Sequence, residues 1–441
     1  MSQANNGRVD FATMQTAAGI PKISEMGTGY VFSRNEIGRL RKLAEQVAGI
    51  ASEREQEEKA ALWREHNDLK TRYPVVFIDP ENGWNECLSA DKLECEDPLA
   101  RVWEMGLLKQ IFWAREFRDD KVIEPYFDVP HVYSDDGWGL DLQHVGGEDG
   151  GSYKIIGALR DYGVDFPRLH CPRITIDEES SNRVMELAED IFGGFLSVRR
   201  KTTWWWSFGL TYDYIMIRGF ENFLVDLIDE PEWVAKTMAL LCEGVIDKLD
   251  FLEKNGLMAL NTDGTYVGSG GLGYTSQLPS FETRSEKITT KDMWGFVESQ
   301  EMVSVSPEMY AEFLYPHHER IAGMFGLNCY GCCEPFNPRW KYIKNLPNLR
   351  RVSVSPWADM KTVPELLEDK YIASIKLTPA HLAMPVMDEK TVRSELRAAL
   401  ETTRGCVVEL IMKDNNTLGN NPENGKNWVR IAREEISAIY G

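Results

Sequence analysis

The fold is decided by one stretch in which two apolar runs flank a helix. It reads Trp294-Gly-Phe-Val-Glu298, then Ser306-Pro-Glu308, then Leu327-Asn-Cys-Tyr330. Both apolar runs have the length of strands. Between them, Ser306-Pro-Glu308 supplies an N-cap, a proline at the first helical position and an acid in the first turn. A strand, a helix and a strand in this order predict a βαβ unit and therefore a parallel sheet.

The same alternation of short apolar runs and helical segments continues on both sides of this stretch. The expected strands are 74–78, 121–124, 203–208, 257–261, 294–298, 327–330, 351–355, 372–377 and 407–411. About nine strands separated by helices favour a closed barrel over an open sheet. The sequence therefore predicts an α/β fold, a (β/α)8 TIM barrel with an N-terminal helical extension.

The chain divides into two predicted parts. Residues 1–70 form an N-terminal arm and helical extension: the first 30 are polar and glycine-rich, and apolar residues then recur at helical spacing from Ile37 to Ile50. Residues 71–441 form the barrel, which is the catalytic domain.

Composition excludes several classes of protein. With 441 residues and 43% apolar content the chain can bury a large core, yet no window reaches the roughly 20 apolar residues of a membrane span. A formal net charge of −20 argues against nucleic-acid binding. Eight cysteines are too few for a disulfide scaffold, and Met1–Asn6 opens no export signal. We expect a cytoplasmic protein without a membrane or nucleic-acid partner; a homo-oligomer stays open.

Three cysteines cluster where one expected strand ends, in Leu327-Asn-Cys-Tyr-Gly-Cys-Cys-Glu-Pro335. Several thiolates at one point favour a soft-metal site, because the ion lowers the thiol pKa. Two alternatives remain, a redox pair and buried cysteines that act as small apolar side chains.

Polar residues follow the other expected strands as well. They are Asp79, Glu81, Glu124, Asn261, Asp263, Glu298 and Glu301. Barrel chemistry takes place where strands end and loops begin, so these side chains and the cysteines predict one acidic and thiolate mouth. Each carboxylate taken singly can instead be a cap or a salt-bridged loop residue.

The order of these motifs resembles the uroporphyrinogen decarboxylase-like superfamily. The similarity is carried by Glu298-Ser-Gln-Glu301, Ser306-Pro-Glu-Met-Tyr310, the cysteine cluster, Leu377-Thr-Pro-Ala-His-Leu382 and Asn421-Pro-Glu-Asn-Gly-Lys-Asn-Trp428. It covers roughly residues 70 to 440, with the specific matches between about 290 and 425. The chain looks closest to the zinc-dependent corrinoid (cobalamin) methyltransferases, because it lacks the arginine-rich porphyrinogen motif of the decarboxylase.

The resemblance implies a zinc site with an altered ligand set. The family's usual His-x-Cys pair is replaced by Tyr330-Gly-Cys332, and its late-strand Cys or His by Asp414-Asn-Asn416. Cys332, Cys333 and Glu301 are the implied ligands, and Cys329 or a late-strand residue is the alternative third one. Adjacent cysteines on a strand point to opposite faces, so a turn after Gly331 is needed to aim both inward.

The implied reaction moves a methyl group from a small methylated compound, such as a methoxylated aromatic, to a corrinoid. No corrinoid-binding Asp-x-His-x-x-Gly loop is present, so a separate corrinoid protein is the expected partner. Glu298 and Asp263 are the predicted catalytic residues. The predicted substrate-binding residues are Asn261, Trp204, Trp206 and Tyr330.

Three further segments carry weaker signals. Thr203-Trp-Trp-Trp-Ser207 places Trp204 and Trp206 on one strand face and Trp205 on the other, as a substrate wall or as core. The Gly268–Gly273 run favours a mobile loop over the mouth rather than a dinucleotide site. His317 and His318 lie in a helical run and are expected to be structural or exposed rather than metal ligands.

Two other classes of function remain at this level. One is a metal-independent decarboxylase or lyase, in which Asp263, Glu298 and Glu301 transfer protons. The other is a non-catalytic barrel that binds a ligand. Metal content separates the methyltransferase from both.

Overall fold

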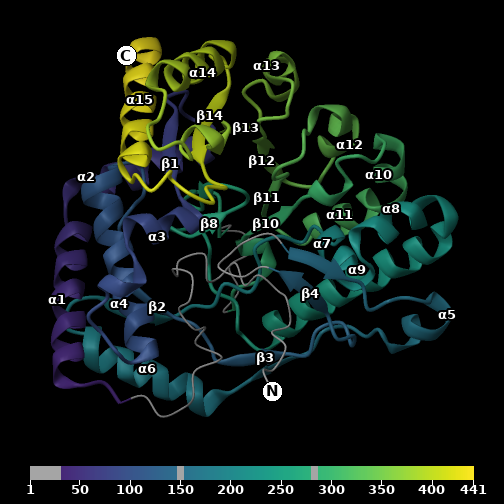
Figure 1. Ribbon diagram of the computed structural model, residues 1–441, viewed down its shortest axis with the longest axis horizontal. Coiled ribbons are helices and arrows are strands. Elements are labelled where there is room, and N and C mark those ends of the chain that lie inside the picture. The colour runs from purple at the N-terminus through teal and green to yellow at the C-terminus, as the bar shows by residue number, and fades with distance from the viewer. Residues whose placement is uncertain (1–30, 147–152, 280–286) are drawn as a thin grey trace.

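A parallel sheet forms the centre of the fold in the computed structural model, which describes residues 31–146, 153–279 and 287–441. Within these ranges the largest sheet has six strands in the order β1 (Val75–Ile78), β14 (Val407–Met412), β13 (Ile372–Lys376), β12 (Leu349–Val354), β11 (Leu327–Tyr330) and β10 (Trp294–Val297). Every neighbouring pair is parallel. We call it the main sheet (Figure 1).

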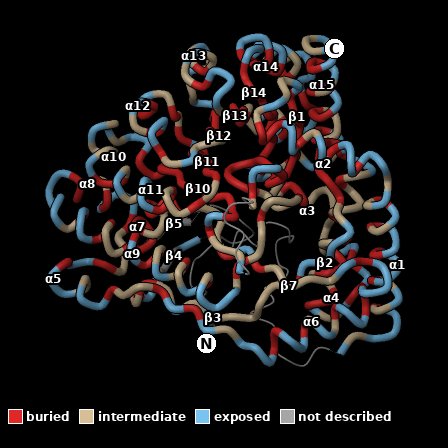
Figure 2. The backbone as a smooth tube through the Cα atoms, turned by 180° about the vertical axis from the view of Figure 1, so that it is seen from behind, coloured by how far each residue is buried: buried red, intermediate tan, exposed pale blue. Residues whose placement is uncertain are grey.

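Helices connect the strands of the main sheet and cover its outer side. They are α10 (Pro307–Phe313), α11 (Tyr315–Ala322), α12 (Trp340–Ile343), α13 (Val363–Leu367), α14 (Glu389–Thr402) and α15 (Glu423–Tyr440). Ser306 caps α10 through a bond from Met309 N, with Pro307 at the first position, as the sequence predicts. The strands are buried, while the helices expose their outer faces (Figure 2).

Among the described residues, which begin at residue 31, two helices precede β1. α1 (Arg34–Ala51) begins with a capping box between Ser33 and Glu36, and α2 (Arg54–Asn67) follows directly. α1 packs against α4 (Pro98–Phe112) and α6 (Glu178–Phe192). The predicted helical extension is therefore present; the predicted arm, residues 1–30, lies outside the described residues, and the boundary at residue 70 stays a prediction.

The remaining elements lie between β1 and β10 in the chain. Four short strand pairs are β2 (Tyr126–Val129) with β7 (Ser197–Arg200), β3 (Tyr133–Asp135) with β6 (Ile174–Ile176), β4 (Gln143–Gly146) with β5 (Tyr153–Ile156), and β8 (Tyr266–Val267) with β9 (Gly271–Leu272). The helices are α3 (Trp84–Cys87), α5 (Tyr162–Asp165), α7 (Thr211–Arg218), α8 (Phe220–Asp229) and α9 (Pro231–Lys254). None of the described helices is long and apolar enough to cross a membrane.

Three predicted strands, 121–124, 203–208 and 257–261, are not strands in the structure. The reason lies at β1 and β10, the two edges of the main sheet. There, side chains of the neighbouring segments form hydrogen bonds with the strand backbone, which a further strand would otherwise form. At β1, the carboxylates of Asp120 and Asp119 accept from Val76 N at 2.7 Å and Ile78 N at 2.9 Å. At β10, the amide of Asn261 bonds both N and O of Trp294 at 2.9 Å.

Single backbone bonds still attach two of these segments to the sheet edges. Asp120 N donates to Val76 O and Phe208 N to Phe296 O, both at 2.8 Å. The segments therefore run beside β1 and β10 without forming strands. The α/β class holds, whereas closure into a full eight-stranded barrel is not confirmed.

The glycine-rich run is a buried hairpin, not the predicted mobile loop. Gly268 and Gly271 belong to β8–β9 and its turn, and lie against Cys329 and Arg351 of the main sheet. A Cβ on either glycine would clash with those side chains, so the glycines permit the backbone of the hairpin to lie close against them. The run serves packing on the inner face of the sheet.

Candidate active site

The two adjacent cysteines lie in a turn just beyond β11. Gly331 has a φ of +85°, the left-handed conformation that the sequence requires at this point. Glu334 fixes the turn by accepting from Cys332 N at 2.9 Å and from Ser299 N at 2.8 Å. As a result the Sγ atoms of Cys332 and Cys333 lie 3.6 Å apart, the first buried and the second exposed. The predicted turn is confirmed.

Charged and polar groups from other strands surround this thiol pair. Ser269 Oγ donates to Cys332 Sγ at 3.2 Å, and Asp414 Oδ2 lies 4.0 Å from Cys333 Sγ. Lys413, directly after β14, reaches both Asp414 at 3.3 Å and Glu81 at 3.5 Å. The hydrogen bond with Cys333, together with burial, holds the pKa of the Cys332 thiol well above its usual range.

Glu298 is a buried carboxyl of this region whose acidity is shifted by its surroundings. It is fully buried, and its Oε1 and Oε2 accept from Ser207 Oγ and Gln300 N, both at 3.0 Å. Burial, followed by the charges of Glu301, Glu334 and Cys332, holds the pKa of Glu298 well above its usual range. Burial and these charges therefore favour the protonated form of the carboxyl, which is the form that can donate a proton. The catalytic role predicted for it is compatible with this state.

The candidates for a third metal ligand lie in different places. Glu301 Oε2 accepts from Thr211 Oγ1 at 2.6 Å, and Cys329 Sγ contacts Arg351 Nη1 at 3.5 Å. Neither has a recorded contact with the thiol pair, whereas Asp414 does. Across the ranges that the structure describes, no group of three or more His, Cys, Asp and Glu side chains is already gathered as a metal site. Within these ranges the thiols form a close pair, without a third side chain of this kind gathered with them as a metal site.

Asp263 is an ion-pair partner. Lys201 Nζ lies 2.7 Å and Arg199 Nη2 2.8 Å from its Oδ2. Burial acts to raise the pKa of Asp263, but the charge and hydrogen bond of Lys201, with Thr265 and Arg199, together outweigh it and the pKa falls to about 2. A carboxylate held in this state does not donate a proton near neutrality. The geometry is compatible with a positioning role for Asp263, and its catalytic role stays a prediction.

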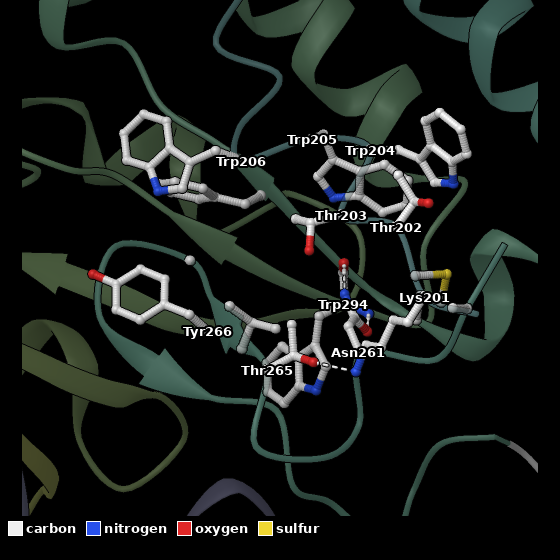
Figure 3. A pocket seen from close by; sticks show the side chains of 15 residues that line it. Lys201, Thr202, Thr203, Trp204, Trp205, Trp206, Asn261, Thr265, Tyr266 and Trp294 are labelled. Carbon is white, nitrogen blue, oxygen red and sulfur yellow. Dashed lines mark hydrogen bonds between the residues drawn. The ribbon is translucent and has the colours of Figure 1, made fainter. Parts of the chain in front are cut away.

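The predicted tryptophans and Asn261 do come together, around a small cavity beside β10 (Figure 3). Trp204, Trp206 and Asn261 line it, with Tyr266 and Lys201, and its volume is about 30 Å³. That is room for a water and not for an aromatic substrate. The side-chain amide of Asn261 is already hydrogen-bonded to the backbone of Trp294.

The predicted two-face arrangement of the tryptophans does not hold. Trp204 packs on His131 and Tyr133, whereas Trp206 packs on Phe296 and lies 5.6 Å from Lys413 Nζ. Without a strand at 203–208, side chains do not alternate between two faces. Trp206 is connected to the thiol pair through Lys413, because Lys413 lies over its ring and also pairs with Asp414, the neighbour of Cys333.

Tyr330 points away from the thiol pair. Cys329 faces the inner side of the sheet, so the next residue of β11 faces the helices, where Tyr330 Oη bonds Ser299 Oγ at 2.8 Å. His318 of α11 lies beside it, fully buried, with Nε2 3.2 Å from Gly209 O. His318 is structural, as predicted; Tyr330 does not point at the thiol pair and is linked to the thiol turn indirectly, through Ser299 and Glu334.

Sequence reasoning missed two lysines, Lys376 and Lys413, which the structure places near the thiol pair. Lys376 ends β13 and is 4% exposed; Lys413 follows β14 and is equally buried. Each is a charged residue at the end of an apolar strand. That position in the sequence was the available signal.

Comparisons with known proteins give little further guidance. No protein-family model matches this chain, and no curated protein matches it. Among solved structures, a methyltransferase from Methanosarcina mazei is similar, with a TM-score of 0.40 and 11% sequence identity, over 69% of this chain and 77% of that chain. We draw no conclusion about fold or function from a likeness at this TM-score.

Proposed function

We propose that this protein is a zinc-dependent methyltransferase that moves a methyl group from a small methylated compound to a corrinoid held by a partner protein. One observation carries the proposal: two thiols 3.6 Å apart at the carboxyl end of a parallel sheet, near the buried carboxyl of Glu298, whose pKa burial and then neighbouring charges raise. The motif resemblance to the corrinoid methyltransferases points the same way. A complete (β/α)8 barrel remains part of this proposal.

The donor chemistry of the thiol pair suits zinc. Two thiolates bound to one tetrahedral zinc at about 2.3 Å lie roughly 3.8 Å from each other, close to the separation found here. We assign Cys332 and Cys333 as ligands. For the third ligand we favour Asp414 over Glu301, because Asp414 already contacts Cys333 and Glu301 is bonded to Thr211. A fourth position is left for substrate, as a catalytic zinc requires.

The roles of the surrounding residues follow from their state. Zinc bound here would supply Lewis-acid polarisation of the substrate oxygen. Glu298 holds a proton that it can give to that oxygen as the methyl group leaves, and Ser207 orients its carboxyl. Lys413 pairs with Asp414, the neighbour of Cys333, and lies over the ring of Trp206, which would place a positive charge beside the thiol pair.

A methyl-transfer assay tests this function. Zinc-loaded protein is mixed with reduced cobalamin and a panel of methoxylated aromatics, and loss of the cobalt(I) absorbance is followed. We expect transfer from at least one donor, slowed by about 10²- to 10⁴-fold in Glu298→Gln. Glu308→Gln, an exposed carboxylate paired with Lys341, is the matched control and should be unchanged.

The alternative function has its own outcome. No transfer from any donor by protein that holds zinc, together with Glu298-dependent proton exchange into a bound acid, would replace the methyltransferase by a metal-independent lyase.

A further inference from the structure

Lys376 is a buried cation whose recorded partners are neutral. Its Nζ lies 2.8 Å from Ser353 Oγ, 3.3 Å from Ser374 Oγ and 3.4 Å from Ser374 O. No ion pair within 4.0 Å joins it to a carboxylate of the residues that the structure describes. Burial of an ammonium group without a charged partner costs free energy of folding. We therefore expect its hydrogen bonds to have a role that an apolar side chain could not fill.

Ser353 links this lysine to the thiol turn. Its Oγ donates to the carbonyl oxygen of Cys332 at 2.7 Å, and its Cβ lies under Gly331, 3.4 Å from where a Cβ on that glycine would be. An ammonium group can only donate, so Ser353 must accept from Lys376. The single proton of the hydroxyl is then left for the Cys332 carbonyl. Lys376 thereby fixes the direction of the Ser353 hydrogen bond.

We propose that Lys376 is a positioning residue of the thiol site: it orients Ser353, which holds the Gly331–Cys332 turn so that both sulfur atoms face one point. The inference deepens the proposed function and rests on it for the zinc ligation alone. The positioning of the turn itself does not require metal. Outer groups that orient metal ligands commonly change metal affinity by about 10- to 100-fold.

Four variants separate this role from plain packing. Lys376→Met keeps the length of the side chain and removes its donors, and Ser353→Ala removes the link. Ser353→Thr retains the hydroxyl and should rescue. Ser374→Ala is the matched control, because Ser374 contacts Lys376 but has no recorded bond to the turn.

Two readouts are needed, one without metal. Amide hydrogen exchange of the peptide that contains Gly331–Glu334 is measured on metal-free protein, and zinc affinity is measured by competition with a chelating dye. In Lys376→Met and Ser353→Ala we expect faster exchange confined to this turn and zinc affinity lower by about 10- to 100-fold. Ser374→Ala and Ser353→Thr should stay close to the parent in both.

Unchanged exchange in Lys376→Met and Ser353→Ala would overturn the proposal. Exchange that rises equally over the whole main sheet, or Ser374→Ala behaving like Lys376→Met, would also overturn it in favour of packing. If the parent binds no zinc but the turn alone loosens in the two variants, the positioning role stands and the proposed function fails.

Discussion

Replacement of Arg351 by methionine should destabilise the protein strongly. Arg351 is buried on the inner face of the main sheet, with Nε 3.0 Å from Glu409 Oε1 and Nη2 donating to Asn67 Oδ1 at 2.7 Å. Without the guanidinium, Glu409 keeps a hydrogen bond with His66 at 3.2 Å, but burial lowers the pKa of His66, so this imidazole does not replace the lost positive charge. Removing one partner of a buried ion pair typically costs about 3–5 kcal/mol.

The titration of Glu409 gives an independent magnitude. Burial acts to raise the pKa of Glu409, but Arg351 and then His66 outweigh it and lower the pKa from 4.5 to about 2. At 1.36 kcal/mol per unit this corresponds to about 3 kcal/mol, on the order of the mutational figure. Because the folded pKa is depressed, this stability is present above the unfolded pKa and is lost as the pH falls from about 4.5 toward 2.

Urea unfolding followed by tryptophan fluorescence at pH 7 measures the effect. We expect Arg351→Met to lose about 3–5 kcal/mol, and the double variant Arg351→Met/Glu409→Gln to recover part of the loss because no buried carboxylate remains unpaired. Arg320→Met is the control: it breaks an exposed pair with Glu243 and should cost less than about 1 kcal/mol. A loss in Arg351→Met as small as in that control would refute the reasoning.

Three further outcomes are expected. Iodoacetamide should alkylate exposed Cys333 at least about tenfold faster than buried Cys332, read by peptide mass spectrometry; equal rates would contradict the turn geometry. Gly209→Ala places a Cβ on the Glu298 carboxyl and should cost about 1–3 kcal/mol in urea unfolding, so a neutral effect would argue against their contact. Burial lowers the pKa of His318 to about 3, so its unfolded form binds the extra proton below about 6.5; the free energy of unfolding should fall by about 2 kcal/mol from pH 7 to 5, and His318→Gln should remove that dependence.

The sequence was sufficient for the regular part of the fold. Continuous apolar runs such as Val407–Met412 and the Ser306-Pro307 helix start are local signals, and the main sheet and its helices follow them. The sequence did not predict where a side chain, and not a neighbouring strand, bonds the backbone at the edge of the sheet. Nothing in Leu257–Asn261 shows that the amide of Asn261 will cap Trp294, because that bond joins segments 33 residues apart.

The same limit applies to the site. The turn after Gly331 could be predicted, since two adjacent cysteines converge only in a turn. The roles of Asp263 and Glu301 could not, because they depend on Lys201 and Thr211, which lie 62 and 90 residues away in the chain. Charge partners of this kind are set by tertiary packing and leave no local pattern.

The central claim, that Cys332 and Cys333 hold zinc, is tested most directly by elemental analysis of the purified protein and of Cys332→Ser and Cys333→Ser. Cys242→Ser, at a buried cysteine remote from the site in sequence, is the control. The account predicts about one zinc per chain in the parent and the control, and loss of the metal in both site variants while they remain folded. A folded parent that takes up no zinc when it is supplied, or site variants that retain it, would contradict the account.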